Sequence, residues 1–231
     1  GYGVSTGADN TLIGRQAGHA TMTGDYNVAL GYLAMYGVTS AGEATAVGYR
    51  AMVANCTANG TTALGSYTLT NNTSGAYNTA VGCTALITNV TGSNNTAVGH
   101  GACYANTGSG NTAVGRSALA ANTSGSDNTV LGYGAGGDIT TGTNNIAIGK
   151  DSLALQTVGS FNVSIGDYAL DAANHADAGY NVAVGNNCLT DVTEGAANVG
   201  IGYNAGDGIT TGTYNTGLGY GVAFDVDAAN Q

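Results

Sequence analysis

The sequence contains no proline and no tryptophan, and only four of its 231 residues are Lys or Arg. Charged residues make up 8% of the chain, and the 14 acidic residues give a formal net charge of −10. The lack of proline excludes a collagen-like chain, and the low charge beside 43% hydrophobic residues excludes an acidic disordered chain. The scarcity of Glu, Lys and Gln also disfavours a helical protein, whose exposed faces need them.

These absences also limit the partners. Four basic residues are too few to neutralise a phosphate backbone, so we expect no nucleic acid partner and no binding to anionic membranes. No run of 18 apolar residues exists, which argues against membrane insertion. The first residues, Gly1–Val4, include no Met and no signal-peptide pattern, so we expect a segment of a longer protein.

The four cysteines show no CxxC pair and no zinc-like spacing. They are Cys56, Cys83, Cys103 and Cys188. We therefore predict unpaired thiols that are buried as small hydrophobic side chains.

What the sequence does have is glycine, 40 residues of it, and many of these glycines are periodic. Thirteen anchor glycines recur at intervals of 17 residues, with one interval of 16 and one of 19. They are Gly14, Gly31, Gly48, Gly65, Gly82, Gly99, Gly115, Gly132, Gly149, Gly166, Gly185, Gly202 and Gly219. A fixed period of this length indicates a repeat architecture.

The residues around each anchor glycine form regular columns. The residue before it is always aliphatic, the residue three before it is Thr, Val or Ile, and the residue four before it is Asn in eleven repeats. The resulting unit, Asn-Thr-Ala-Val-Gly, predicts a short strand with Thr and Val on one face and Asn and Ala on the other. A second apolar pair, such as Ala85-Leu86, predicts a second short strand in each repeat.

One 17-residue coil buries too little to be stable alone, so the coils must stack. We predict an all-β protein, a parallel β-solenoid or β-roll of about thirteen 17-residue coils. Residues 1–231 would form one repetitive segment, with the repeats over about 7–222. Stacking brings equivalent residues about 4.8 Å apart. We expect the aliphatic column before each anchor glycine to form the interior.

The stacked asparagines are expected to form a structural ladder of side-chain amides. This ladder consists of Asn78, Asn95, Asn111, Asn128, Asn145, Asn162, Asn181, Asn198 and Asn215. In this arrangement the face that carries Asn and Ala has no partner within the coil. The small Ala side chains would allow another backbone to approach closely, so we expect a homo-oligomer, most simply a homotrimer.

The motif Asn-Thr-Ala-Val-Gly-x-x-Ala-Leu, as in residues 78–86 and 111–119, resembles the repeats of bacteriophage tail fibres. It also resembles the head repeats of YadA-like trimeric autotransporter adhesins. The resemblance covers nearly the whole chain, although the adhesin heads use somewhat shorter coils. It implies a trimer of left-handed parallel β-rolls that binds host or matrix molecules, located on a virion or an extracellular surface.

The residues one and two after the anchor glycines vary most and carry large side chains. They include Tyr32, Tyr49, Tyr133, Tyr203, Tyr220 and all four basic residues, Arg15, Arg50, Arg116 and Lys150. They could be solvent-facing turn residues, or they could form a surface that binds a host glycan or protein.

Two other functions remain open. A threonine column suggests an ice-binding solenoid, although we expect it to share a face with the core aliphatics. A carbohydrate-active enzyme would need paired carboxylates, and the nearby Asp151 and Asp167 form no cluster in the sequence.

His19, His100 and His175 occupy different repeat positions, so no column of metal ligands results. We therefore predict no catalytic, metal or cofactor site.

Overall fold

The computed structural model describes residues 6–54, 56–172 and 178–223. These residues are all-β without a helix, and thirteen parallel strands of three residues form a β-solenoid of about twelve turns. The chain divides into two compact units, the first ending at Asn111 and the second beginning at Thr112. Each unit is described by itself.

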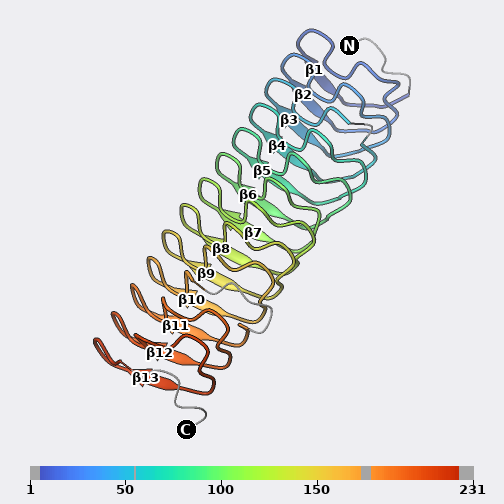
Figure 1. The fold of residues 1–231 in the computed structure, drawn as a ribbon. Coiled ribbons are helices and arrows are strands. Elements are labelled where there is room, and N and C mark those ends of the chain that lie inside the picture. Colours follow the sequence, from blue (N-terminus) through green and yellow to red (C-terminus); the bar gives the residue numbers. More distant parts are fainter. Residues whose placement is uncertain (1–5, 55, 173–177, 224–231) are drawn as a thin grey trace. The chain divides into compact units, whose positions relative to one another are not determined.

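The first unit contains six strands that follow one another in sequence order (Figure 1). Their bounds are β1 Thr11–Ile13, β2 Val28–Leu30, β3 Thr45–Val47, β4 Thr62–Leu64, β5 Thr79–Val81 and β6 Thr96–Val98. The second unit contains seven strands in the same arrangement. Their bounds are β7 Thr112–Val114, β8 Thr129–Leu131, β9 Ile146–Ile148, β10 Val163–Ile165, β11 Val182–Val184, β12 Val199–Ile201 and β13 Thr216–Leu218.

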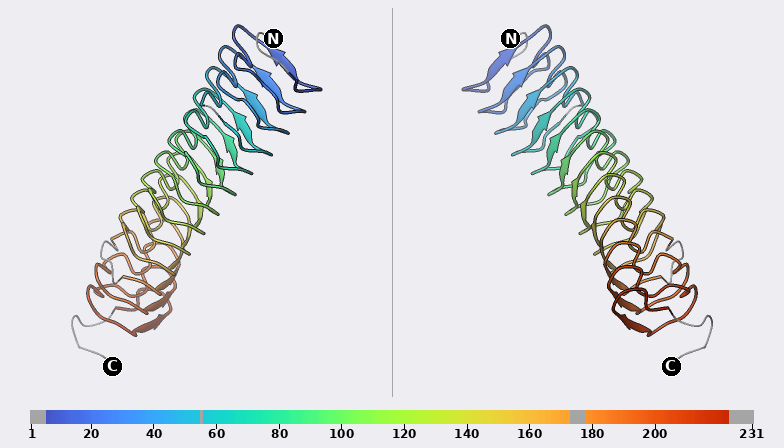
Figure 2. Two further views of the ribbon diagram at one scale, coloured as in Figure 1. Left: turned by 90° about the vertical axis from the view of Figure 1, so that its right-hand side faces the viewer. Right: turned by 90° about the vertical axis from the view of Figure 1, so that its left-hand side faces the viewer.

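Neighbouring strands pair one coil apart, so equivalent repeat positions lie side by side. Between β3 and β4, for example, Thr45 is opposite Thr62 and Ala46 is opposite Ala63. The strands of each unit lie along one side of its coils, and turns complete the rest of each coil (Figure 2). The predicted parallel β-solenoid is therefore confirmed. Each strand pairs with the strand one repeat, usually 17 residues, further along the chain.

The anchor glycines end the strands for two physical reasons. Their φ angles lie between +125° and +145°, a region that L side chains rarely adopt. They also stack closely, since a Cβ on Gly48 would lie 2.4 Å from the carbonyl oxygen of Gly65 in the next coil. Only glycine satisfies both conditions.

The burial of the strands corrects one prediction. In β2 to β13 the middle residue is buried, while the residues on either side are half-buried or exposed. The interior column is therefore the small residue, such as Ala63 or Ala80, and the aliphatic column faces outward. The alternation was predicted correctly, but the face that lies inside is the opposite one. The coil is thin, and small side chains on the strand leave room for larger ones from the opposite side.

Those larger side chains come from the second apolar stretch, which is a turn rather than the predicted second strand. Met52, Leu69 and Leu86 are fully buried and have φ angles of 56°, 46° and 51°. A left-handed conformation costs a non-glycine residue roughly 1–2 kcal/mol. Burying a large apolar side chain contributes about 1.5–3 kcal/mol, which offsets that cost.

Candidate functional site

The asparagines four residues before the anchors lie inside the coils and join each coil to the next. The Asn78 Nδ2 donates to the carbonyl oxygen of Gly92 at 2.7 Å, and its Oδ1 accepts the backbone N–H of Asn95 at 2.9 Å. The same pair of bonds recurs at Asn95 and Asn181. The ladder therefore runs mainly through backbone groups of the next coil. Its members Asn111, Asn128, Asn145, Asn162 and Asn198 are also fully buried, and Asn215 is half-buried.

A second column of buried asparagines was not predicted. Asn72, Asn89, Asn106 and Asn122 follow their anchors by seven residues, and all are fully buried. The Asn72 and Asn122 amides donate to Gly75 and Gly125 carbonyl oxygens at 2.9 and 2.8 Å. At three of these positions the sequence has an Asn-x-Ser/Thr pattern. This is the acceptor pattern for N-glycosylation, so it suggests a surface residue rather than a buried one.

The outward face of the strands combines a threonine column with an aliphatic column. Leu64 in the first unit is 45% exposed, and Leu131 in the second is 47% exposed. Threonine lies two residues before each of them, at Thr62 and Thr129. We call this surface of each unit the strand face. Its strands are parallel, and its side chains are regularly spaced and uncharged, which is unusual for a surface open to water.

The four basic residues all lie over tyrosine rings of the next coil. The guanidinium carbons of Arg15, Arg50 and Arg116 are 5.8, 5.8 and 5.6 Å from the ring centres of Tyr32, Tyr67 and Tyr133. The Lys150 ammonium is 4.8 Å from the ring centre of Tyr168. Its hydrogen bond to the Tyr168 hydroxyl, and secondarily the nearby Asp151, raise the pKa of Lys150.

The remaining predicted tyrosines stack on one another. The rings of Tyr32 and Tyr49 are 5.6 Å apart, and those of Tyr203 and Tyr220 are 5.2 Å apart. The structure thus groups the predicted residues along short ladders within each unit. A ring stacked on both sides presents its edge to the outside, which limits the area that it offers to a flat ligand.

A second aromatic column was missed in the sequence. Tyr26, Tyr77, Phe161, Tyr180 and Tyr214 lie five residues before their anchors, and all are exposed with φ angles near +60°. Other coils have Asp, Glu, Asn, Gly or Ala at this position, so the column is visible only once the left-handed backbone is known. Each of these residues lies two positions before the first residue of its strand, so the column follows one border of the strand face.

Three of the four cysteines are buried, but Cys83 is exposed, contrary to prediction. All four are free thiols. Burial raises the pKa of the Cys103 thiol to about 12, and it also raises the pKa of the Cys56 and Cys188 thiols.

We therefore expect iodoacetamide at pH 8 to alkylate Cys83 alone in the folded protein, because the thiolate is the reacting species and must be accessible. Peptide mass spectrometry would locate the label, and the same reaction in urea should label all four cysteines. Rapid labelling of Cys103 without denaturant would contradict the burial that the structure shows.

The described residues hold little else that suggests chemistry. They contain no group of three or more His, Cys, Asp or Glu side chains placed to bind a metal. Asp167 accepts the backbone N–H of Lys150, and Asp151 is 3.7 Å from the Lys150 ammonium. His19 stacks on Tyr36, and His175 lies outside the described residues. No helix in the described part of the chain could cross a membrane.

Comparison with known proteins adds no assignment. The sequence matches no protein-family model and none of the curated proteins searched.

Proposed function

We propose that the chain is a structural and adhesive fibre segment that assembles as a homotrimer and contacts a host surface. The observation that carries this proposal is the exposed strand face, a flat column of aliphatic side chains beside a column of threonines. Such a surface is stabilised when another copy covers it, since about 25 cal/mol is gained for each Å² of apolar surface removed from water.

The face that supports a trimer is therefore not the one that the sequence suggested. Asn and Ala are inside the coil, and the Thr and aliphatic columns are available to a neighbouring chain. The left-handed coil and the number of three chains come from the resemblance to fibre repeats. A bacteriophage tail fibre or virion appendage is the first proposal, and the head of a YadA-like adhesin is the alternative. Both place the chain on a virion or an extracellular surface, with a host glycan or protein as partner.

Light scattering coupled to size-exclusion chromatography tests the assembly. We expect the wild-type protein to be a trimer and the Leu64→Lys variant to be a folded monomer, because the change puts charges into the proposed interface. The control is Leu155→Lys, since Leu155 is 51% exposed but lies outside the strands. A wild-type protein that is monodisperse as a monomer would contradict the trimer.

One observation favours a second function. The threonine column was expected to share a buried face, but it lies on the exposed strand face, as an ice-binding surface would require. This function needs the strand face open to water, whereas the fibre needs it covered. Thermal hysteresis in a solution of the wild-type protein would support ice binding, and its absence would dismiss it.

A further inference from the structure

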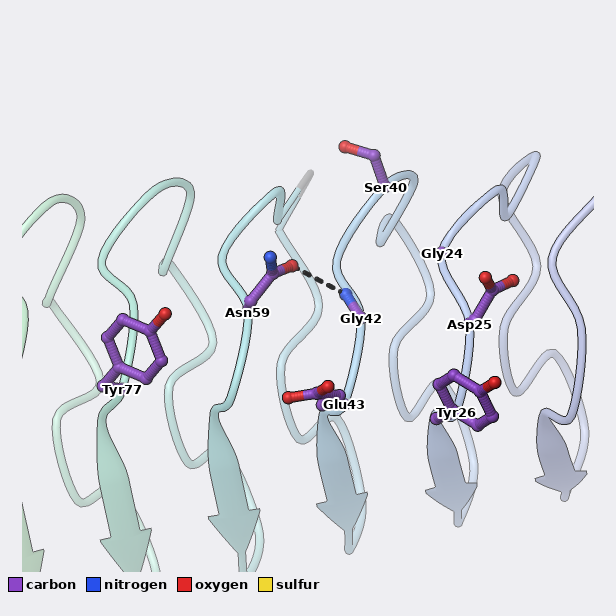
Figure 3. Close-up of a pocket in the computed structure, with 8 residues that line it drawn as sticks. All are labelled: Gly24, Asp25, Tyr26, Ser40, Gly42, Glu43, Asn59 and Tyr77. Atoms are coloured by element: carbon purple, nitrogen blue, oxygen red, sulfur yellow. Dashed lines mark hydrogen bonds between the residues drawn. The ribbon is translucent and has the colours of Figure 1, made fainter.

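A hollow of about 480 Å³ opens on the surface of the first unit, between two rings of the second aromatic column. Tyr26 and Tyr77 border it. Asp25 lies in the same coil as Tyr26, and Glu43 and Asn59 come from the two coils between the rings (Figure 3). Its size falls within the range of small-ligand sites in proteins.

The two rings are placed to contact an elongated ligand. Tyr26 and Tyr77 are 62% and 64% exposed, and three coils separate them, which corresponds to about 14 Å along the stack. The Tyr77 ring rests against Gly60, where a Cβ would lie 2.8 Å from the ring carbon Cδ1. Rings this far apart cannot both contact one small ammonium group, but they can contact the two ends of a chain-like molecule.

The polar side chains that line the hollow supply mainly hydrogen-bond acceptors. Ionised Asp25 and Glu43 only accept, while the Asn59 amide has both a donor and an acceptor. The Asn59 Oδ1 accepts the backbone N–H of Gly42 at 2.9 Å, which fixes the amide with its NH₂ as the remaining group. A ligand with several hydroxyl groups can donate to the carboxylates and accept from this amide.

The hollow exists because of Gly42. At the equivalent position in several other coils, a side-chain oxygen accepts a backbone N–H from the preceding coil, as Ser93 does from Ala76 at 3.1 Å. Gly42 has no side-chain oxygen that could accept the backbone N–H of Asp25 in the same way. A Cβ at Gly42 would meet its nearest atom, the Asp25 carbonyl oxygen, only at 3.4 Å, so the space is open.

We infer that this hollow binds an uncharged oligosaccharide of two or more sugar units. The C–H faces of its end sugars pack on Tyr26 and Tyr77, and its hydroxyls bond to Asp25, Glu43 and Asn59. The two carboxylates, in a chain of net charge −10, repel sialylated or sulfated glycans. The inference rests on the proposed adhesive function and specifies where, and to which class of glycan, the fibre would bind.

The test is binding of the wild-type protein and three variants to an array of neutral and acidic oligosaccharides. The wild-type protein should retain neutral oligosaccharides and not acidic ones. Gly42→Ser should weaken this binding strongly, because the serine occupies part of the hollow while supplying the hydrogen bond found in several other coils. Tyr77→Ala should weaken binding about tenfold through loss of one stacking contact.

The control is Tyr214→Ala, which removes an exposed ring of the same column in the second unit and should bind like the wild type. Unchanged binding by Gly42→Ser, a preference for acidic glycans, or no binding of neutral glycans would overturn the inference. Light scattering separates the two proposals. A monomer with Gly42-dependent binding contradicts the trimeric fibre alone, whereas a trimer with Gly42-independent binding contradicts this site alone.

Discussion

Replacing Gly48 with alanine is expected to lower the free energy of unfolding by about 3–5 kcal/mol, or to prevent folding. The φ angle of Gly48 is +138°, which an alanine adopts only with strain. The added Cβ would also lie 2.4 Å from the Gly65 carbonyl oxygen and 2.6 Å from its carbon. Because these are backbone atoms of the next coil, relief of the overlap would separate paired strands.

Urea denaturation would measure the change, and Gly42→Ala in the same coil is the matched control. Gly42 lies outside the left-handed region of φ, and its added methyl group would have ordinary contacts. We expect that variant to be as stable as the wild type, or up to about 1 kcal/mol more stable through the less flexible unfolded chain. Equal effects of the two substitutions would contradict the distinction between anchor glycines and other glycines.

Asn95→Asp is expected to destabilise the protein by about 3 kcal/mol at pH 7, although it changes almost no volume. Asn95 is fully buried, and its Nδ2 donates to the Gly108 carbonyl oxygen at 2.9 Å. A carboxylate would place an oxygen against that carbonyl and an unpaired charge inside the coil. The adjacent Asn94→Asp is the control, since Asn94 is exposed and should tolerate the same change.

The loss in Asn95→Asp should also depend on pH. Burial and the facing carbonyl raise the folded-state pKa of the new carboxyl above its unfolded value of about 3.9. The unfolded state then releases the proton first, so stability falls as the pH rises above about 4 and recovers below it. Urea denaturation at pH 3.5 and pH 7, with Asn94→Asp alongside, would measure this. A penalty independent of pH would show that the carboxyl is not buried as Asn95 is.

Much of the fold could be predicted because a repeat multiplies each local signal. The three residues before each anchor glycine form a strand in all thirteen cases, since β-branched residues at a period of two favour extended backbone. The 17-residue spacing gave the pairing register because only one register aligns like side chains. The cysteines were also correctly predicted to be free thiols.

The orientation of the strands could not be predicted, because alternation defines two faces without saying which lies inside. Val81 and Ala80 differ in size, and the larger side chain was assumed to be in the core. The interior space is instead filled by residues such as Leu86, whose left-handed backbone has no simple sequence pattern. The hollow beside Tyr77 was also missed, since it depends on which coils lack a side chain at one turn position.

The pairing of equivalent positions one coil apart has a consequence for evolution of the protein. Removal of residues 49–65 within the first unit would join Gly48 to Ser66, and every column on either side would still meet its equivalent. Insertion of one further coil would likewise create only contacts that already occur. Recombination between repeats in the gene could therefore change the number of coils within a unit. The surface residues of each remaining coil would be unchanged, so coil number and surface can evolve independently.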